Sequence, residues 1–379
     1  MVEDLPHASL PAELRSSALR IQAEGIGVDA HLDTLQRVLY EGVDLRQELC
    51  DGHVDLPRLR KGGVGVAFFA MWVPPYYQGA EAVRRTLDFF DVLFGVLEAA
   101  QDQMELVRRW PDVEGARSRG KIAALATIEG GHQMGNDLAV LRIYHRLGAR
   151  LMTLTHSRSH DWADSSTDVP RHHGLTRFGE QVIDEMNRLG MIVDVSHASD
   201  QTFFHVLRVA HKPVIASHSG CRSVANVPRN LSDEMLRSLA DNGGVICINF
   251  HGPHLSPGDA PLAAQATSEE EPTSDLSGKA LDEWAAQQHR RIAARHLVSC
   301  ATIGDVVAHI DHAVRIAGVE SVGIGSDYDG GIIPPRGLED VSARPMLIAA
   351  LLARGYRDEV IQKIMGGNVL RIVRSNMTA

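Results

Sequence analysis

Residues 191–218 read MIVDVSHASDQTFFHVLRVAHKPVIASH. The segment begins and ends with short apolar runs rich in Val and Ile, MIVDVSH (191–197) and PVIASH (213–218), and a helical stretch separates them. A strand, a helix and a second strand in this order predict two neighbouring parallel strands joined by a crossover helix. Both runs finish in histidine, so the segment also places chemistry-bearing side chains at the C-terminal ends of two strands.

Eight such runs alternate with amphipathic stretches along the chain, the pattern of a buried parallel sheet covered by helices. They are GIGVDA (25–30), VGVAFFAMWV (64–73), IAALATIE (122–129), LMTLTH (151–156), MIVDVSH, PVIASH, GVICINF (244–250) and SVGIGSD (321–327). Helical stretches such as 176–190 and 232–244 close with glycine near the expected C-cap. Because the phosphate-binding turn of a doubly wound fold is missing and each run is followed by one crossover, we predict an α/β fold of the closed (β/α)8 TIM-barrel type.

The 379 residues are predicted to form a single barrel domain, 1–379, with a short helical extension over roughly the first twenty residues. An insertion at about 255–290 follows the seventh run. Within it, residues 256–279 are rich in Pro, Ala, Ser and acids, which favours a long mobile loop. This loop could serve as a lid, as a subunit contact, or as a plain solvated insertion.

Charge and cysteine content exclude several classes of protein. The formal net charge is -10, from acids scattered along the chain, so neither a nucleic acid nor an anionic membrane is expected as a partner. The four cysteines lack CxxC spacing and are predicted to be free and buried. The N-terminal residues have no basic segment before an apolar core, and no run of 18 apolar residues occurs. These observations favour a cytoplasmic protein.

Five side chains at or just beyond the predicted strand ends form a candidate metal site. They are His31, Asp33, Glu129, His197 and His218. Imidazole and carboxylate groups suit Zn²⁺, and ligands drawn from several strands indicate an open catalytic site rather than a closed structural one. Any one histidine alone is better read as a hydrogen-bonded core or surface residue, and Glu129 alone as a capping or salt-bridged acid. Taken together, they favour a coordinated site in which Glu129 bridges two ions.

The His-x-Asp pattern occurs twice, and context decides between the two copies. In an extended strand residues two apart face the same side, so His31 and Asp33 can grip one ion. Only this pair follows an apolar run, whereas His53 and Asp55 precede one. The second pair is therefore expected at the N-terminal end of its strand, on the opposite face of the barrel, although it stays open as the alternative ligand pair.

Three further residues have candidate roles at the same end of the barrel. Asp327 closes the last run, where an acid could move protons between a water and a leaving group, and Asp329 in the following loop is its competitor. His156 could donate a hydrogen bond to a developing oxyanion. Arg229 could pair with a substrate carboxylate, although an arginine before a helix is more often a surface residue.

The motifs resemble those of the membrane (renal) dipeptidase family, peptidase family M19 of the amidohydrolase superfamily, over nearly the whole chain. The similar segments are VDAHLDT (28–34), HVDLPRLRKGGVGVAFFA (53–70), TIEGGH (127–132), LMTLTH with WADS (162–165), DVSH (194–197), ASHS (216–219), RNLSD (229–233), GIGSDYDG (323–330) and GGNVLRI (366–372). The likeness implies two zinc ions per chain, one held by His31, Asp33 and Glu129, the other by Glu129, His197 and His218. It also implies that His156 and Arg229 bind the substrate, that Asp327 is the general acid/base, and that the protein is a homodimer.

This chain departs from the well-known animal members in two respects. Those members are secreted and lipid-anchored, whereas no signal peptide or apolar C-terminal tail is seen in this chain. Where animal members carry a substrate-contacting tyrosine, the chain reads NFHGPH (249–254). The resemblance therefore implies the chemistry more strongly than the substrate preference.

The hypothesis from sequence is a zinc-dependent dipeptidase, possibly acting on dipeptides with a C-terminal D-residue. A hydroxide shared by the two ions would attack the peptide carbonyl, with Asp327 carrying its proton to the leaving amine. The alternatives are another amidohydrolase of lactonase, deaminase or phosphotriesterase type, because one fold hosts many reactions, and a catalytically silent metal-binding protein.

Overall fold

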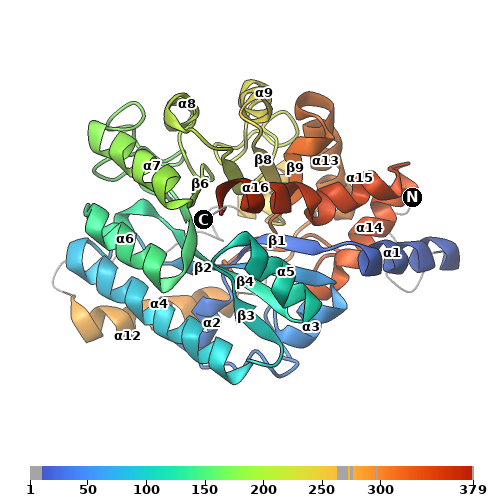
Figure 1. The fold of residues 1–379 in the computed structure, drawn as a ribbon, viewed down its shortest axis with the longest axis horizontal. Helices are drawn as coiled ribbons and strands as arrows, with labels where there is room; N and C mark the ends of the chain where they lie inside the picture. Colours follow the sequence, from blue (N-terminus) through green and yellow to red (C-terminus); the bar gives the residue numbers. More distant parts are fainter. Residues whose placement is uncertain (1–10, 263–271, 274–275, 296, 378–379) are drawn as a thin grey trace.

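Eight parallel strands form the barrel wall in the computed structural model, which describes residues 11–262, 272–273, 276–295 and 297–377 (Figure 1). Their spatial order is β1, β2, β4, β5, β6, β7, β8 and β9. The bounds are β1 Gly27–Leu32, β2 Val64–Trp72, β4 Ile122–Glu129, β5 Ala149–Thr153, β6 Ile192–Asp194, β7 Ile215–Ser219, β8 Val245–Ile248 and β9 Val322–Ile324. Every neighbouring pair is parallel, which sends all the carboxyl ends to one face.

The barrel closes where the segment after β9 meets the end of β1. Leu32 and Tyr328 form a parallel bridge. The Asp33 amide donates to the Tyr328 carbonyl oxygen over 2.9 Å, and the Asp327 amide donates to the His31 carbonyl oxygen over 3.1 Å. This seam brings the first His-x-Asp pair beside Asp327, although nearly 300 residues separate them along the chain.

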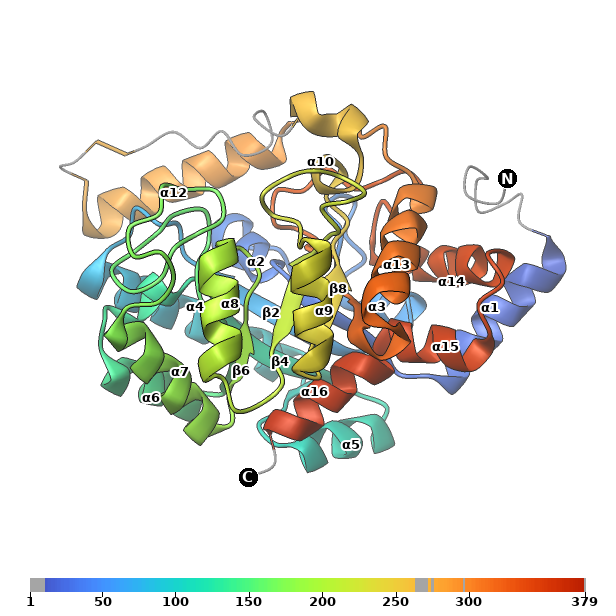
Figure 2. The same cartoon turned by 90° about the horizontal axis from the view of Figure 1, so that it is seen from above.

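Helices cover the outside of the barrel, and α7, α8, α9 and α13 lie in a row along one side (Figure 2). The α-helices are α1 Ala12–Glu24, α2 Leu35–Glu41, α3 Leu56–Lys61, α4 Gly79–Ala99, α5 Trp110–Ser118, α6 Leu138–Leu147, α7 Arg177–Leu189, α8 Asp200–Val209, α9 Asp233–Asp241, α10 Gly252–Leu255, α12 Gly278–Ala293, α13 Ile303–Ala317, α14 Arg344–Ala353, α15 Asp358–Gln362 and α16 Asn368–Asn376. Side-chain caps begin several of them; Thr176 accepts from the Gly179 amide, and Ser232 from the Met235 amide. The predicted glycine ends are also confirmed, with Gly190 in the left-handed region at the end of α7.

The predicted (β/α)8 barrel is confirmed, and each of the eight apolar runs overlaps one barrel strand. The differences lie at the ends of the strands. β6 stops at Asp194, so His197 lies in the following turn with φ 65°. One short strand was not predicted: β3, Met104–Leu106, pairs with the first half of β4.

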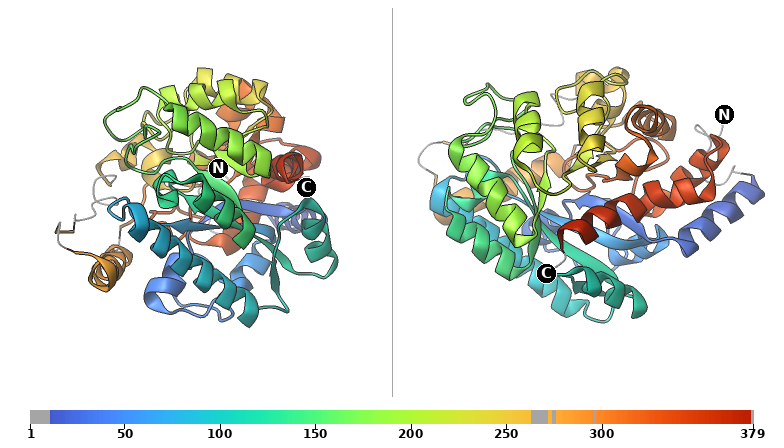
Figure 3. Two further views of the ribbon diagram at one scale, coloured as in Figure 1. Left: turned by 60° about the vertical axis from the view of Figure 1, so that its left-hand side comes forward. Right: turned by 45° about the horizontal axis from the view of Figure 1, so that its top comes forward.

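An N-terminal helix and the insertion after β8 add to the eightfold repeat. α1 packs against α14, at the end of the molecule opposite α12 in Figure 1. The insertion after β8 contains α10, a short 3-10 turn at Pro257–Asp259, and α12. Figure 3 (left) shows α12 as the orange helix at the lower left edge, and it contacts α2. Residues 263–271 and 274–275 of the predicted mobile loop lie outside the described residues.

The cysteine prediction is correct only in part. All four cysteines are free, and Cys221 and Cys247 are buried, but Cys50 and Cys300 are exposed. Both exposed residues lie in loops between elements rather than on the apolar strands and helix faces that form the core. Within the described residues, no helix combines the length and apolar character needed to cross a bilayer.

Candidate metal centre

The carboxylate of Glu129, the last residue of β4, lies at the centre of a histidine cluster. Its Oε2 is 3.3 Å from His31 Nε2, and its Oε1 is 3.2 Å from His197 Nε2 and 3.3 Å from His218 Nε2. The cluster is buried, with at most 9% of any of the four residues exposed. One oxygen of this side chain therefore faces one histidine nitrogen, and the other oxygen faces two.

The first group contains His31, Asp33 and Glu129. Asp33 Oδ2 is 3.3 Å from His31 Nε2, and the Gln36 side-chain amide donates to Asp33 Oδ1 over 3.0 Å. The second group contains Glu129, His197 and His218, whose Nε2 atoms are 2.8 Å apart. The donor atoms form three overlapping clusters: Glu129 with His31 and His218, Glu129 with His156 and His197, and Asp33 with His31 and Asp327. Carboxylate and imidazole groups this close together fit divalent cations.

The protonation states of the histidines also suit a metal site. Burial lowers the pKa of His197 and His218 well below the usual range, so both rings are neutral, the form in which imidazole binds a metal. At His31 burial works in the same direction, but the Glu129 and Asp33 carboxylates outweigh it and raise its pKa well above the usual value. His31 Nε2 is buried and, among the described residues, has no hydrogen-bond partner. The two carboxylates therefore attract a cation to this atom.

Asp327 lies beside the first group, with a carboxylate oxygen close to donor atoms of both His31 and Asp33, all within 4.8 Å of one another. Burial raises its pKa well above the usual range, and the carboxylates of Asp33 and Glu129 act in the same direction. Its backbone is left-handed, with φ 67°. A side chain at Gly330 would lie 2.5 Å from Asp33 Oδ2 and 2.8 Å from Asp327 Oδ1, so only glycine permits this close approach.

His156 and Arg229 lie next to the second group. His156 Nε2 is 3.9 Å from Glu129 Oε1, and its ring packs against His197 and edge-on against Trp72. Arg229 is buried, not a surface residue, and donates from Nη2 to the His218 carbonyl oxygen over 3.0 Å. Its Nη1 is buried and has no hydrogen-bond partner among the described residues. An unpaired buried guanidinium nitrogen is suited to an anionic group of a ligand.

The position predicted for the second His-x-Asp pair is wrong. His53 lies at the face formed by the carboxyl ends of the strands, where its Nδ1 accepts from the Asp329 amide over 3.0 Å and its own amide donates to Asp329 Oδ1 over 2.8 Å. The error arose because α3 separates the pair from β2, so the pair does not begin a strand. Asp55 caps α3 and accepts from Arg58 Nε over 2.6 Å. Neither residue belongs to a cluster of metal-type donors in the described part of the chain.

Asp329, the alternative to Asp327, turns away from the donor groups. Besides its contacts with His53, its Oδ2 accepts from the Thr34 hydroxyl over 2.8 Å. It therefore ties the loop after β9 to the residues that follow β1.

Sequence reasoning missed the residues that hold the ligands in place. The clearest are Asp194 and Ser217, both fully buried and hydrogen-bonded to each other beneath His218. The available signals were an acid within the apolar run MIVDVSH and a serine directly before the histidine of ASHS. Neither signal shows that Asp194 and Ser217 contact each other, because the two residues meet only when β6 and β7 pair.

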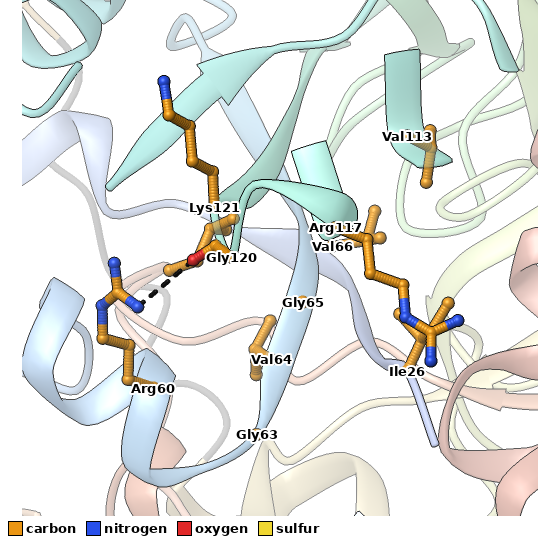
Figure 4. Close-up of a pocket in the computed structure, with 11 residues that line it drawn as sticks. Ile26, Arg60, Gly63, Val64, Gly65, Val66, Val113, Arg117, Gly120 and Lys121 are labelled. Carbon is orange, nitrogen blue, oxygen red and sulfur yellow. Dashed lines mark hydrogen bonds between the residues drawn. The ribbon is translucent and has the colours of Figure 1, made fainter. Parts of the chain in front are cut away.

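A separate cavity of about 280 Å³ lies at the other end of the barrel (Figure 4). Its lining includes residues at the N-terminal ends of β2 and β4 and the cationic residues Arg60, Arg117 and Lys121. Arg60 donates to the Gly120 carbonyl oxygen over 3.4 Å. Its lining contains no His, Cys, Asp or Glu, so it is not part of the metal centre.

Comparison with known proteins agrees with this geometry. The family model for membrane dipeptidases (peptidase family M19) matches residues 15–379. Dipeptidase 3 of Mus musculus is 36% identical over 376 residues, which is 95% of this chain and 66% of that protein. The chain thus spans just under two thirds of the length of this relative.

Two solved structures are also similar. The probable dipeptidase PvdM from Pseudomonas aeruginosa superimposes with a TM-score of 0.80 at 24% identity, covering 97% of this chain and 99% of that one, and shares the fold. A metallopeptidase from Rhodobacter sphaeroides, liganded with a phosphinate mimic of the dipeptide L-Ala-D-Ala, has a TM-score of 0.76 at 25% identity and covers 93% of this chain and 99% of that one.

Proposed function

The chain belongs to the membrane dipeptidase family, peptidase family M19, and from this premise we propose that it hydrolyses the peptide bond of dipeptides with two zinc ions. One observation carries the proposal: Glu129 Oε2 faces the nitrogen of His31, whereas its Oε1 faces the nitrogens of His197 and His218. His31 and Asp33 would hold one ion with Glu129, and His197 and His218 would hold the other. When bound, such ions activate a water molecule and polarise a carbonyl group.

The remaining polar groups have distinct parts in the proposed reaction. Asp327 takes the proton of the attacking water and delivers it to the leaving amine nitrogen, for which its place beside His31 and Asp33 is suitable. Arg229 binds the free carboxylate of the dipeptide through its unpaired Nη1. His156, partly exposed beside Glu129, donates to the carbonyl oxygen as negative charge develops on it.

We also propose that a D-residue is accepted at the C-terminal position of the dipeptide. The support is indirect: the Rhodobacter sphaeroides metallopeptidase is liganded with a mimic of L-Ala-D-Ala. A cytoplasmic setting and a homodimer remain predictions.

The test is hydrolysis of a matched panel of L,L and L,D dipeptides by zinc-loaded protein, with chelator-treated protein as the control. Cleavage is expected for free dipeptides, is expected to disappear on chelation and to return with zinc, and is expected to be much weaker for dipeptide amides. The amides lack the carboxylate that Arg229 would bind. Zinc-independent cleavage, or no cleavage of any free dipeptide, would exclude the proposed activity.

A further inference from the structure

We propose that Asp194 and Ser217 are positioning residues that fix a proton on Nδ1 of His218, leaving its Nε2 free to bind metal. The inference rests on the proposed two-metal site, because it concerns the orientation of one ligand of that site. It rests on hydrogen bonds between buried groups of β5, β6 and β7 and the residues that follow β6.

Asp194, the last residue of β6, is surrounded by hydrogen-bond donors. Its Oδ1 accepts from the amides of Ser196 and Ser217 over 3.0 and 2.9 Å. Its Oδ2 accepts from the hydroxyls of Thr153 and Ser217, each over 2.6 Å. All four contacts are donated to the carboxylate, so its charge is held in one orientation.

The direction of the Ser217 hydroxyl follows from this arrangement. Ser217 has one proton, and that proton is directed to Asp194 Oδ2. His218 Nδ1 lies 2.8 Å from Ser217 Oγ, which can then only accept from it. His218 therefore carries its proton on Nδ1, and its Nε2 faces Glu129 Oε1 and His197 Nε2 with a free lone pair. This is the tautomer that a metal ligand bound through Nε2 requires.

The same hydroxyl also reaches the other half of the site. His31 Nδ1 lies 3.4 Å from Ser217 Oγ, a longer contact in which the same oxygen can accept from the ring. In the proposed site His31 and His218 bind different ions, and their rings lie 3.8 Å apart. His197 differs, because its Nδ1 is buried with no partner among the described residues. Two of the three histidines thus have a contact from Nδ1 to Ser217, whereas His197 is held through Nε2, by Glu129 and His218.

Replacement of Asp194 by Asn should reverse the direction of the hydrogen bonds that link residue 194, Ser217 and His218. The shape of the side chain at position 194 stays nearly the same. Two backbone amides point at Oδ1, so the carbonyl oxygen of Asn must occupy that side. Its NH₂ group then takes the place of Oδ2 and donates to Ser217 Oγ. The serine proton turns toward His218 Nδ1, and the histidine proton moves to Nε2, where it blocks the metal-binding lone pair.

The experiment compares Asp194→Asn with Thr153→Val in the full-length protein. Thr153 is the matched control, because it donates to the same Oδ2 but does not contact either histidine through that hydroxyl. Histidine tautomers are read by long-range ¹H–¹⁵N correlation on chelator-treated, ¹⁵N-histidine-labelled protein, with His218 assigned from a His218→Gln spectrum. Zinc affinity is measured separately by competition with a chromophoric chelator.

In the unaltered protein and in Thr153→Val we expect His218 protonated on Nδ1. In Asp194→Asn we expect the proton on Nε2 and a 10- to 100-fold weaker second zinc site. If Asp194→Asn does not fold, Ser217→Ala is used, with loss of the uniform Nδ1-protonated state as the expected result. An Nε2-protonated His218 in the unaltered protein, or unchanged tautomer and affinity in the variants, would overturn the inference. Because the tautomer is read without metal or substrate, failure to cleave dipeptides would count against the proposed function alone.

Discussion

At the scale of single residues, two side chains of this centre are attached to backbone in an unfavourable conformation. His197 and Asp327 both have left-handed backbones, with φ 65° and 67°, which few residues other than glycine adopt. Such strain is usually retained where the side chain has to point in one direction. Here the His197 side chain reaches Glu129, and the Asp327 side chain lies beside His31 and Asp33.

The position of Asp327 permits two roles, and a single substitution separates them. Asp327→Asn keeps the shape of the side chain but removes the group that would accept a proton. If Asp327 is the general acid/base, zinc content should be unchanged while turnover falls by about 10²- to 10⁴-fold. Metal analysis and dipeptide kinetics on the same sample test this prediction. Loss of one zinc would identify Asp327 as a metal ligand. Full zinc content together with full activity would show that Asp327 is neither the general acid/base nor a ligand.

The two His-x-Asp pairs supply a matched comparison. We expect His31→Asn to lose zinc from the first donor group, because His31 Nε2 lies between Asp33 and Glu129. His53→Asn should retain both ions, because His53 contacts Asp329 instead. Zinc stoichiometry after dialysis against a weak chelator measures both variants. Equal zinc loss from the two would mean that the His53–Asp329 contact is itself needed to hold the site.

At the scale of elements, α12 is held to the barrel by a few polar contacts. Asp282 Oδ1 accepts from the Tyr77 hydroxyl over 2.8 Å and from Arg84 Nη2 over 2.7 Å. His289 Nε2 lies 2.8 Å from Glu41 Oε1, and Trp284 packs edge-on against Tyr76. The insertion after β8 is thereby attached to α2 and to the segment from the end of β2 to α4.

Removal of the Asp282 carboxylate should loosen this attachment. Asp282→Ala is expected to reduce the free energy of local opening of α12 by on the order of 1–2 kcal/mol, since the hydrogen bonds of Tyr77 and Arg84 are lost. Hydrogen exchange of residues 278–293 should accelerate while the global unfolding transition changes little. The neighbouring Glu283 is largely exposed, so Glu283→Ala serves as the control. Equal exchange in the two variants would show that apolar contacts alone hold the helix.

At the scale of the whole molecule, buried histidines make the fold sensitive to acid. Burial lowers the pKa of His309 to about 4, with Nδ1 accepting from the Cys221 amide and Nε2 donating to the Leu255 carbonyl oxygen. The same cause lowers the pKa of three other buried histidines to about 3 or 4: His132, His160 and His251. All four are neutral in the folded protein at neutral pH.

Stability should therefore fall as the pH is lowered. Above pH 6.5 or so neither the folded nor the unfolded state binds a proton at these histidines, and below it the unfolded state does so first. Each histidine then costs about 1.4 kcal/mol per pH unit until its folded pKa is reached. Urea unfolding between pH 7 and 5 should show this decline, with a shallower slope in His309→Gln. His211→Gln, at an exposed position, is the control, and an unchanged slope in His309→Gln would contradict the prediction.

Much of the architecture and the donor set can be predicted from the sequence alone. Alternating apolar runs and helical stretches determine the parallel barrel, because such runs can be buried only in a sheet covered on its outer face. The carboxyl ends of parallel strands meet at one face, so His31, Glu129, His197, His218 and Asp327 were expected near one another, and the structure brings them together. Local pattern is sufficient for these conclusions.

Only the tertiary structure decides how the donors are arranged. Residues 53 and 329 meet at the barrel seam although 276 positions separate them, so no local pattern could place His53 beside Asp329. The division of the two Glu129 oxygens between donor groups, and the Asp194–Ser217 contact beneath His218, likewise arise only when strands pair. Strand propensity determines where a side chain stands along the chain, whereas its hydrogen-bond partners depend on closure and packing of the whole barrel.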